Sequence, residues 1–393
     1  MTRVGLVVNP VAGLGGRVGL GGTDGPDRAR TALSLGARPL AGARAAAALG
    51  ELAARTAESA RDGLLVVTAA GRLGADSVAA TGLTERIVYA AGAGRGTSAA
   101  DTAAAVRAVV AEGVDLLLFA GGDGTARDVL GALGSCNSPG SPSSLADVPC
   151  PVLGVPTGVK MHSAVFAVSP RAAGEVAAAW LARAGGVRLR DAEVMDRDED
   201  ALGEGRVTSR LFGWLPVPDV PVRVQQRKTG STAASPGAVG GIAAEVAERV
   251  GEGLLVLGPG STTRAVAAAL GTDVSLTGVD ALALRPGHPP RIVARDARED
   301  TLLALGPAWL ALSPIGGQGF LLGRGNQQIS PRVLRAAGGR ERLLVLCTET
   351  KLAALGGRPL LLDTGDDALD AELSGHLPVI TGRRRTSLYR LAM

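Results

Sequence analysis

The segment LLLFAGGDGT, from Leu116 to Thr125, is the most informative part of the sequence. Its apolar half is typical of a buried parallel strand, and Ala126 to Leu133 behind it is typical of a helix. Glycines let the backbone turn sharply and approach a ligand closely. Backbone N–H groups in such a turn can cradle phosphate oxygens. The pattern therefore predicts an α/β fold with a site at the carboxyl end of this strand.

Asp123 is the candidate catalytic residue in this loop. A carboxylate among phosphate-binding glycines is favourable if it binds Mg²⁺ or accepts a proton from an attacking hydroxyl. The alternative is a plain tight turn in which Asp123 caps the helix, and spacing alone leaves both interpretations open. The sequence has no Gly-x-x-x-x-Gly-Lys-Ser/Thr motif, which disfavours a P-loop kinase. The neighbouring candidates for binding phosphate are Gly121, Gly122, Gly124 and Thr125.

Two further loops follow predicted strands. The strand Val4 to Val8 leads into NPVAGLGG, and Val152 to Val155 leads into PTGVKMHS. The first loop does not match Gly-x-Gly-x-x-Gly strictly. In the second loop, the alternative interpretation of His162 is a histidine with a purely structural role. Because carboxyl ends of parallel strands meet at one edge, we expect these loops to complete one phosphate site. The candidates are Asn9, Gly13, Gly15, Gly16, Gly158, Lys160 and Ser163.

The pattern of predicted strands and helices divides the chain into two domains and a tail. Strands alternate with helices over residues 1–187, which predicts a doubly wound parallel sheet. We expect the helix from Ser98 to Glu112 to be capped by Asp101 or a neighbouring Ser or Thr. Residues 188–376 predict a β-rich, α+β second domain, and residues 377–393 a C-terminal tail.

Composition excludes several classes of protein. Of 393 residues, 46% are hydrophobic but only 2% aromatic, which disfavours a nucleic-acid surface built on base stacking. The net charge of +4 suits an anionic small molecule. The three cysteines have neither metal-site nor disulfide spacing. No signal peptide or long uncharged apolar stretch is present, so we expect a cytoplasmic protein without a membrane partner.

Taken together, Asn9 to Gly13, Gly121 to Thr125 and Pro156 to Ser163 resemble the superfamily of NAD kinases, diacylglycerol kinases and sphingosine kinases. The longer pattern is more similar still to the ATP-NAD kinase family, in its AcoX-like branch, and covers nearly the whole chain. The segments that match that branch are Val18 to Gly25, Gly258 to Thr263, Ser313 to Phe320, Gly323 to Pro331 and Asp363 to Asp366.

This resemblance implies a two-domain kinase with its ligand in the cleft between the domains. The donor would be ATP with Mg²⁺, and the acceptor would be NAD, phosphorylated on the 2′-hydroxyl of its adenosine ribose. Asp123 would take the role of the catalytic carboxylate. The family also implies a homo-oligomer and a C-terminal tail that returns to the first domain.

The resemblance extends to the acceptor site. Ser313 to Phe320 resembles the family's Thr-Pro-Thr-Gly-Ser-Thr-Ala-Tyr segment, and Glu193 fits the Glu of its Asn-Glu pair, although Ala192 replaces the Asn. Loss of that polar contact favours a change of acceptor. The loop from Gly323 to Pro331 contains Arg324 and three amide side chains. These could hydrogen-bond to the edge of a base or bind a phosphate; the alternative is a solvated loop. The candidates for binding substrate are Glu193, Pro314, Gly316, Gly317, Gln318, Phe320, Arg324 and Asn326.

The predicted reaction is in-line phosphoryl transfer, with Asp123 orienting and deprotonating the acceptor hydroxyl. One alternative is a kinase of the same fold acting on a sugar, polyol or nucleotide fragment, with ATP or polyphosphate as donor. A lipid kinase is disfavoured, because no amphipathic aromatic patch is evident. A non-catalytic nucleotide sensor is the alternative from another class. The Gly258 to Thr263 loop is typical of an anion-binding helix start, and its role stays open.

Overall fold

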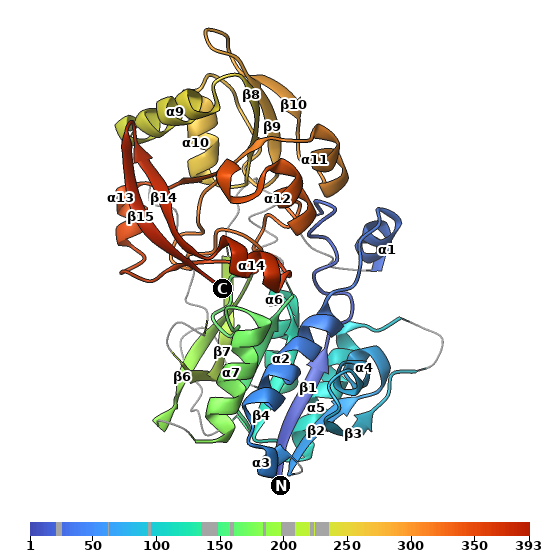
Figure 1. The fold of residues 1–393 in the computed structure, drawn as a ribbon. Coiled ribbons are helices and arrows are strands. Elements are labelled where there is room, and N and C mark those ends of the chain that lie inside the picture. Colours follow the sequence, from blue (N-terminus) through green and yellow to red (C-terminus); the bar gives the residue numbers. More distant parts are fainter. Residues whose placement is uncertain are drawn as a thin grey trace. The chain divides into compact units, whose positions relative to one another are not determined.

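The computed structural model describes residues 1–20, 26–61, 63–92, 96–134, 148–157, 161–183, 186–197, 209–220, 224 and 236–393. The chain forms two compact units (Figure 1). The first comprises Met1–Leu14, Thr23–Ala29 and Arg38–Arg227, and the second comprises Gly15–Gly22, Arg30–Ala37 and Lys228–Met393.

The first unit is built on a parallel sheet with the strand order β3-β2-β1-β4-β5. Every residue of β2, β4 and β5 is buried, as expected for strands covered on both faces. The direction in which strands are added reverses between β1 and β4, which makes their carboxyl ends the switch point of the sheet. The strands are β1 (Thr2–Val8), β2 (Leu64–Ala69), β3 (Thr84–Tyr89), β4 (Leu116–Gly121) and β5 (Val152–Pro156).

Helices cover both faces of this sheet. Right-handed crossovers put the helices before β3 on one face and those that flank β4 on the other. Accordingly, α2 packs against α4 and α7, and α5 packs against α6. Ser98 caps α5 and shares a capping box with Asp101, as predicted. The helices of this unit are α2 (Ala41–Arg55), α3 (Glu58–Arg61), η1 (Gly71–Leu73), α4 (Ala75–Ala79), α5 (Ala99–Ala111), α6 (Asp123–Ala132) and α7 (Pro170–Leu181). The helix α1 (Pro26–Ser34) is divided between the two units.

An antiparallel pair of strands extends the first unit beyond the boundary that we expected after residue 187. The strands β6 (Arg188–Arg197) and β7 (Ser209–Asp219) pair with each other and belong to the first unit. The reason is a set of contacts that no local pattern reveals. The Ala164 N–H donates to the Glu193 carbonyl at 2.8 Å, and α6 packs against β6.

The second unit holds an eight-stranded mixed sheet with the order β10-β9-β8-β11-β12-β14-β15-β13. Its central strands β8, β11, β12 and β14 are parallel, and β9 and β10 add antiparallel strands at one edge. At the other side, β15 pairs antiparallel with β14 and parallel with the edge strand β13. The strands are β8 (Gly253–Leu257), β9 (Asp280–Leu284), β10 (Arg291–Ala294), β11 (Trp309–Leu312), β12 (Leu343–Leu346), β13 (Leu360–Leu361), β14 (Gly375–Gly382) and β15 (Arg385–Ala392).

Side chains from successive residues of these strands enter two separate cores. On β11, Leu310 and Leu312 join one core, whereas Ala311 joins the other. This alternation shows that both faces of the sheet are covered. The covering helices are α9 (Pro236–Val250), α10 (Ser261–Ala269), α11 (Glu299–Leu305), α12 (Pro331–Ala337), η4 (Gly339–Arg342), α13 (Glu349–Ala353) and α14 (Asp367–Leu373).

Residues 377–393, which we expected as a tail returning to the first domain, lie in the hairpin β14–β15 of the second unit. The Cys347 N–H donates to the Ile380 carbonyl, and β14 pairs with β12. The apolar side chains of Leu377, Val379 and Ile380 are buried by this pairing, which explains why the segment completes the sheet. The predicted fold class, a parallel α/β domain followed by a strand-rich second domain, is confirmed.

None of the helices in the described part of the chain combines the length and apolar character that crossing a membrane requires.

Candidate active site

The loops after β1 and β4 are joined at the switch point of the first sheet. The Asn9 N–H donates to the Ala120 carbonyl at 2.9 Å, which continues the pairing of the two strands. The Asn9 side chain then donates from Nδ2 to Thr125 Oγ1, also at 2.9 Å. Two residues predicted from separate motifs therefore lie in direct contact.

Gly121 is required by the position of Thr125. A Cβ atom added to Gly121 would lie 2.3 Å from the Thr125 Cβ, closer than real contacts allow. Gly122 is the N-cap of α6 and provides no side-chain cap, and Gly124 lies in the first turn. The helix therefore starts with its N–H groups close to the glycines, the arrangement that favours an anion.

We expect Gly121→Ala to lower kcat/KM for the predicted phosphoryl transfer at least tenfold. The new methyl group would displace Thr125 and break its contact with Asn9. The stability loss should be about 1–3 kcal/mol, which thermal unfolding can measure. The matched control is Gly131→Ala on α6, where an added Cβ meets nothing within 4 Å. Equal activity of the two variants would contradict this role of Gly121.

Asp123 does not act as the cap of α6, because it occupies the first helical position. Its carboxylate instead accepts two backbone hydrogen bonds, from the His162 N–H at 2.7 Å and from the Ser163 N–H at 3.0 Å. The residue is only 7% exposed. Burial, with a smaller contribution from the Asp196 carboxylate, raises the pKa of the Asp123 carboxyl to about 7, although hydrogen bonds from Ser163 and His162 oppose this shift.

Ser163 lies beside Asp123, but its hydroxyl is used by the backbone of β6. Ser163 Oγ donates to the Met195 carbonyl at 2.8 Å and accepts from the Met195 N–H at 2.9 Å. This contact fixes the segment whose N–H groups hold Asp123. The side chain of His162 is buried.

The other predicted phosphate ligands do not all belong to the first unit. Gly13 has a φ of +80°, and a Cβ there would lie 2.3 Å from the Thr157 carbonyl oxygen, so only glycine permits this approach. Gly15 and Gly16 belong to the second unit, where Gly16 packs on the Gln327 side chain. Gly158 and Lys160 lie outside the described residues.

Glu193 lies on β6, and the structure brings this strand to the Asp123 loop through Ala164 and Ser163. Ala192, at the position of the family's Asn, is fully buried. Asp196 on the same strand forms an ion pair with Arg127 at 3.3 Å. Arg127 also stacks on the Phe212 ring, so these side chains tie α6 to the hairpin.

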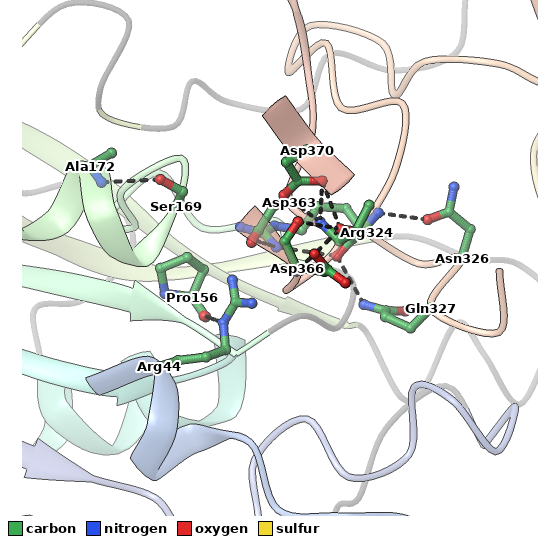
Figure 2. Close-up of polar contacts among 12 residues, drawn as sticks. Arg44, Pro156, Ser169, Ala172, Arg324, Asn326, Gln327, Asp363, Asp366 and Asp370 are labelled. Atoms are coloured by element: carbon green, nitrogen blue, oxygen red, sulfur yellow. Dashed lines mark hydrogen bonds and ion pairs between the residues drawn. The ribbon is translucent and has the colours of Figure 1, made fainter. Parts of the chain in front are cut away.

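Sequence reasoning missed Arg44, Thr157 and the Arg127–Asp196 pair. Arg44 is buried on α2, and its Nε donates to the Pro156 carbonyl at the end of β5 (Figure 2). A signal for it exists, because Arg44 falls within the helical stripe of small and apolar residues that includes Ala41, Ala45 and Ala48. The other residues gave no local signal.

In the second unit, Arg324 and Asn326 are engaged inside the protein (Figure 2). Arg324 forms a buried ion pair with Asp363 and stacks 4.5 Å from the centre of the Phe320 ring. Asn326 accepts from the Gly323 N–H at 3.0 Å and donates to the Leu321 carbonyl at 2.8 Å. These contacts shape the loop, and the expected substrate contacts of Arg324 and Asn326 stay a prediction.

The loop after β11 is likewise folded on itself. The Ile315 N–H donates to the Phe320 carbonyl at 2.8 Å, and Arg358 donates to the Gly317 carbonyl at 2.9 Å. Gln318 and Phe320 are buried. Pro314 lies in this same loop between β11 and Ile315, and Gly316 lies within the turn that the Ile315–Phe320 bond closes.

The loop Gly258 to Thr263 leads into α10, as predicted. Lys351 on α13 donates to Ser313 Oγ at 2.9 Å and to Thr262 Oγ1 at 3.4 Å. The carboxyl ends of β8, β11 and β12 are therefore joined by one ammonium group.

No group of three or more His, Cys, Asp or Glu side chains in the described ranges could hold a metal ion. Asp123 lies within the glycine loop itself.

Two family models match the chain. Residues 4–184 match the ATP-NAD kinase N-terminal domain, and residues 250–391 match the ATP-NAD kinase C-terminal domain. No curated protein and no solved structure matches it.

Proposed function

The chain belongs to the ATP-NAD kinase family and is a kinase-like phosphotransferase, and we propose that it transfers the γ-phosphate of ATP to the 2′-hydroxyl of the adenosine ribose of NAD. The product would be NADP. The observation that carries the proposal is the position of Asp123. It is a buried carboxylate at the switch point of the first sheet, held by two N–H groups beside a glycine loop.

In the proposed reaction Asp123 accepts the proton of the acceptor hydroxyl as that oxygen attacks the γ-phosphorus. A general base works best when its pKa lies near the working pH, and burial raises the pKa of Asp123 to about 7. The backbone bonds from His162 and Ser163 fix the orientation of the carboxylate. Positioning of this kind supplies much of the rate enhancement in phosphoryl transfer.

The loops around Asp123 would bind the phosphates. Asn9 and Thr125 join the loops after β1 and β4. The N–H groups in the first turn of α6, which have no acceptor within the helix, would donate to phosphate oxygens. Mg²⁺, when bound to the nucleotide, would neutralise charge on the transferred group. Gly13, Gly121, Gly122 and Gly124 permit the backbone to approach a phosphate closely.

We expect kcat/KM to rise about tenfold per pH unit below about pH 7 and to level off above it, because Asp123 must be ionised to act as a base. Stability should change in the opposite sense. Since burial raises the carboxyl pKa, ionisation of Asp123 destabilises the fold as the pH rises from about 4 towards 7.

The measurement is kcat/KM between pH 5.5 and 8.5, with Tm recorded in the same buffers. A flat profile across this range would exclude a base with the pKa of Asp123.

A second candidate function is phosphorylation of a different hydroxyl acceptor by the same site. Ala192 favours it, because this buried methyl group cannot make the polar contact that Asn makes in the family. The test is transfer of label from γ-labelled ATP, or from polyphosphate, to NAD and to a panel of nucleosides, sugars and polyols. Labelling of NAD supports the leading acceptor, and labelling of another compound alone replaces it.

A cytoplasmic location, a homo-oligomeric state and the AcoX-like branch stay predictions of the resemblance.

A further inference from the structure

Thr157 is a buried polar residue at the carboxyl end of β5. It is 1% exposed, and its N–H donates to the Gly121 carbonyl at 3.2 Å, so it continues the sheet beside the glycine loop. Within the described part of the chain, no group hydrogen-bonds to its side-chain hydroxyl. A buried hydroxyl without a partner destabilises a fold, and such groups are usually satisfied. A valine would fill the same space without this cost.

A buried positive charge is bound to the residue that precedes Thr157. The Arg44 guanidinium donates from Nε to the Pro156 carbonyl, which belongs to the peptide group that supplies the Thr157 N–H. Arg44 is 9% exposed. A cation held in a buried place raises the local affinity for an anion. A guanidinium is also the side chain that best matches the geometry of phosphate oxygens.

The backbone approaches closely at the same place. Gly13 lies against the Thr157 carbonyl, where any side chain would collide with it. The loop after β1, the loop after β4 and the end of β5 therefore meet at Thr157. Such a convergence at a switch point is where α/β sheets bind their ligands.

We propose that Thr157 and Arg44 form an oxyanion subsite that binds a phosphate group of a nucleotide. The hydroxyl of Thr157 donates to a phosphate oxygen, and the charge of Arg44 neutralises it. The inference rests on the proposed function, and it adds to that function two residues that the glycine motifs do not contain. The phosphate belongs either to the donor or to the acceptor, because both nucleotides carry one.

The decisive variant is Thr157→Val, which removes the hydroxyl and keeps the shape. We expect it to weaken the binding of ADP about tenfold or more, as for loss of a hydrogen bond to a charged group, and to leave adenosine unaffected. Its Tm should equal or exceed that of the wild type, because the hydroxyl has no hydrogen-bond partner among the described residues that the change could remove. A residue of structural importance only would show the reverse pattern.

Arg44→Gln tests the charge, and Arg55→Gln is its matched control. Arg55 lies on the same helix, is 45% exposed, and pairs with Glu51 and Glu175 at the surface. We expect Arg44→Gln to weaken ADP binding about tenfold and Arg55→Gln to leave it unchanged. If Arg44→Gln fails to fold, Thr157→Val alone decides the proposal.

Calorimetric titration with ADP, adenosine and NAD separates the outcomes. Weaker ADP binding by Thr157→Val assigns the subsite to the donor, and weaker NAD binding alone assigns it to the acceptor. Unchanged binding of both, a lowered Tm with unchanged binding, or no binding of either nucleotide by the wild type overturns the proposal. The proposed function is judged separately, by whether the wild type forms NADP.

Discussion

Asp123→Asn is expected to lower kcat about 10²–10⁴-fold while ATP affinity stays within a few-fold of the wild type. An amide cannot accept the proton of the acceptor hydroxyl. It can accept only one of the two N–H bonds that Asp123 receives from His162 and Ser163. Its NH₂ group would face the other N–H, so we also expect a stability loss of about 1–3 kcal/mol.

Asp115→Asn is the matched control for this variant. Asp115 immediately precedes β4, the strand whose other end leads to Asp123. It is exposed and accepts a hydrogen bond from the Arg3 N–H. Steady-state kinetics and ATP titration of both variants check the prediction. If Asp123→Asn retained more than about a tenth of the wild-type kcat, Asp123 could not be the general base.

Asp363→Ala is expected to be the most destabilising single change, at about 3–5 kcal/mol. It would leave the Arg324 guanidinium without its carboxylate at a side chain that is 0% exposed. Breaking a buried ion pair leaves an uncompensated charge, which costs much more than the pair contributes. Denaturant unfolding followed by tryptophan fluorescence and circular dichroism measures the loss, with the second unit unfolding first.

The control for this prediction is a surface pair. Arg335 pairs with Asp366 at 2.8 Å but is 49% exposed, so Arg335→Ala should cost only about 0–1 kcal/mol. The double variant Arg324→Met with Asp363→Leu should regain most of the stability that Asp363→Ala loses. An equal effect of Asp363→Ala and Arg335→Ala would contradict the importance of burial for this pair.

Local pattern predicted the parts of the molecule that depend on near neighbours. The stretch from Leu116 to Thr125 has the strand, the turn and the helix start that the structure shows. Ser98 and Asp101 form the predicted cap, because a capping box spans one helical turn. Asn9 and Thr125 follow the parallel strands β1 and β4, whose carboxyl ends lie at one edge of the sheet, so their proximity was predictable.

Pattern could not predict partners that are distant in the sequence. The N–H groups that hold Asp123 come from residues about forty positions later, through a segment that β6 fixes in place. Arg324 and Asn326 are residue types that often bind ligands. In the structure, Arg324 pairs with Asp363, and Asn326 hydrogen-bonds to the backbone of its own loop. Such choices depend on which groups burial brings together, and residue types alone do not determine them.

The most direct test of the central claim is the formation of NADP from NAD, ATP and Mg²⁺, followed with a dehydrogenase that uses NADP alone. Asp123→Asn at the same concentration is the control for background. We expect NADP to accumulate in proportion to wild-type enzyme and to be nearly absent with the variant. If no NADP forms at high enzyme concentration while γ-labelled ATP transfers its phosphate to another hydroxyl compound, NAD is not the acceptor and the claim is wrong.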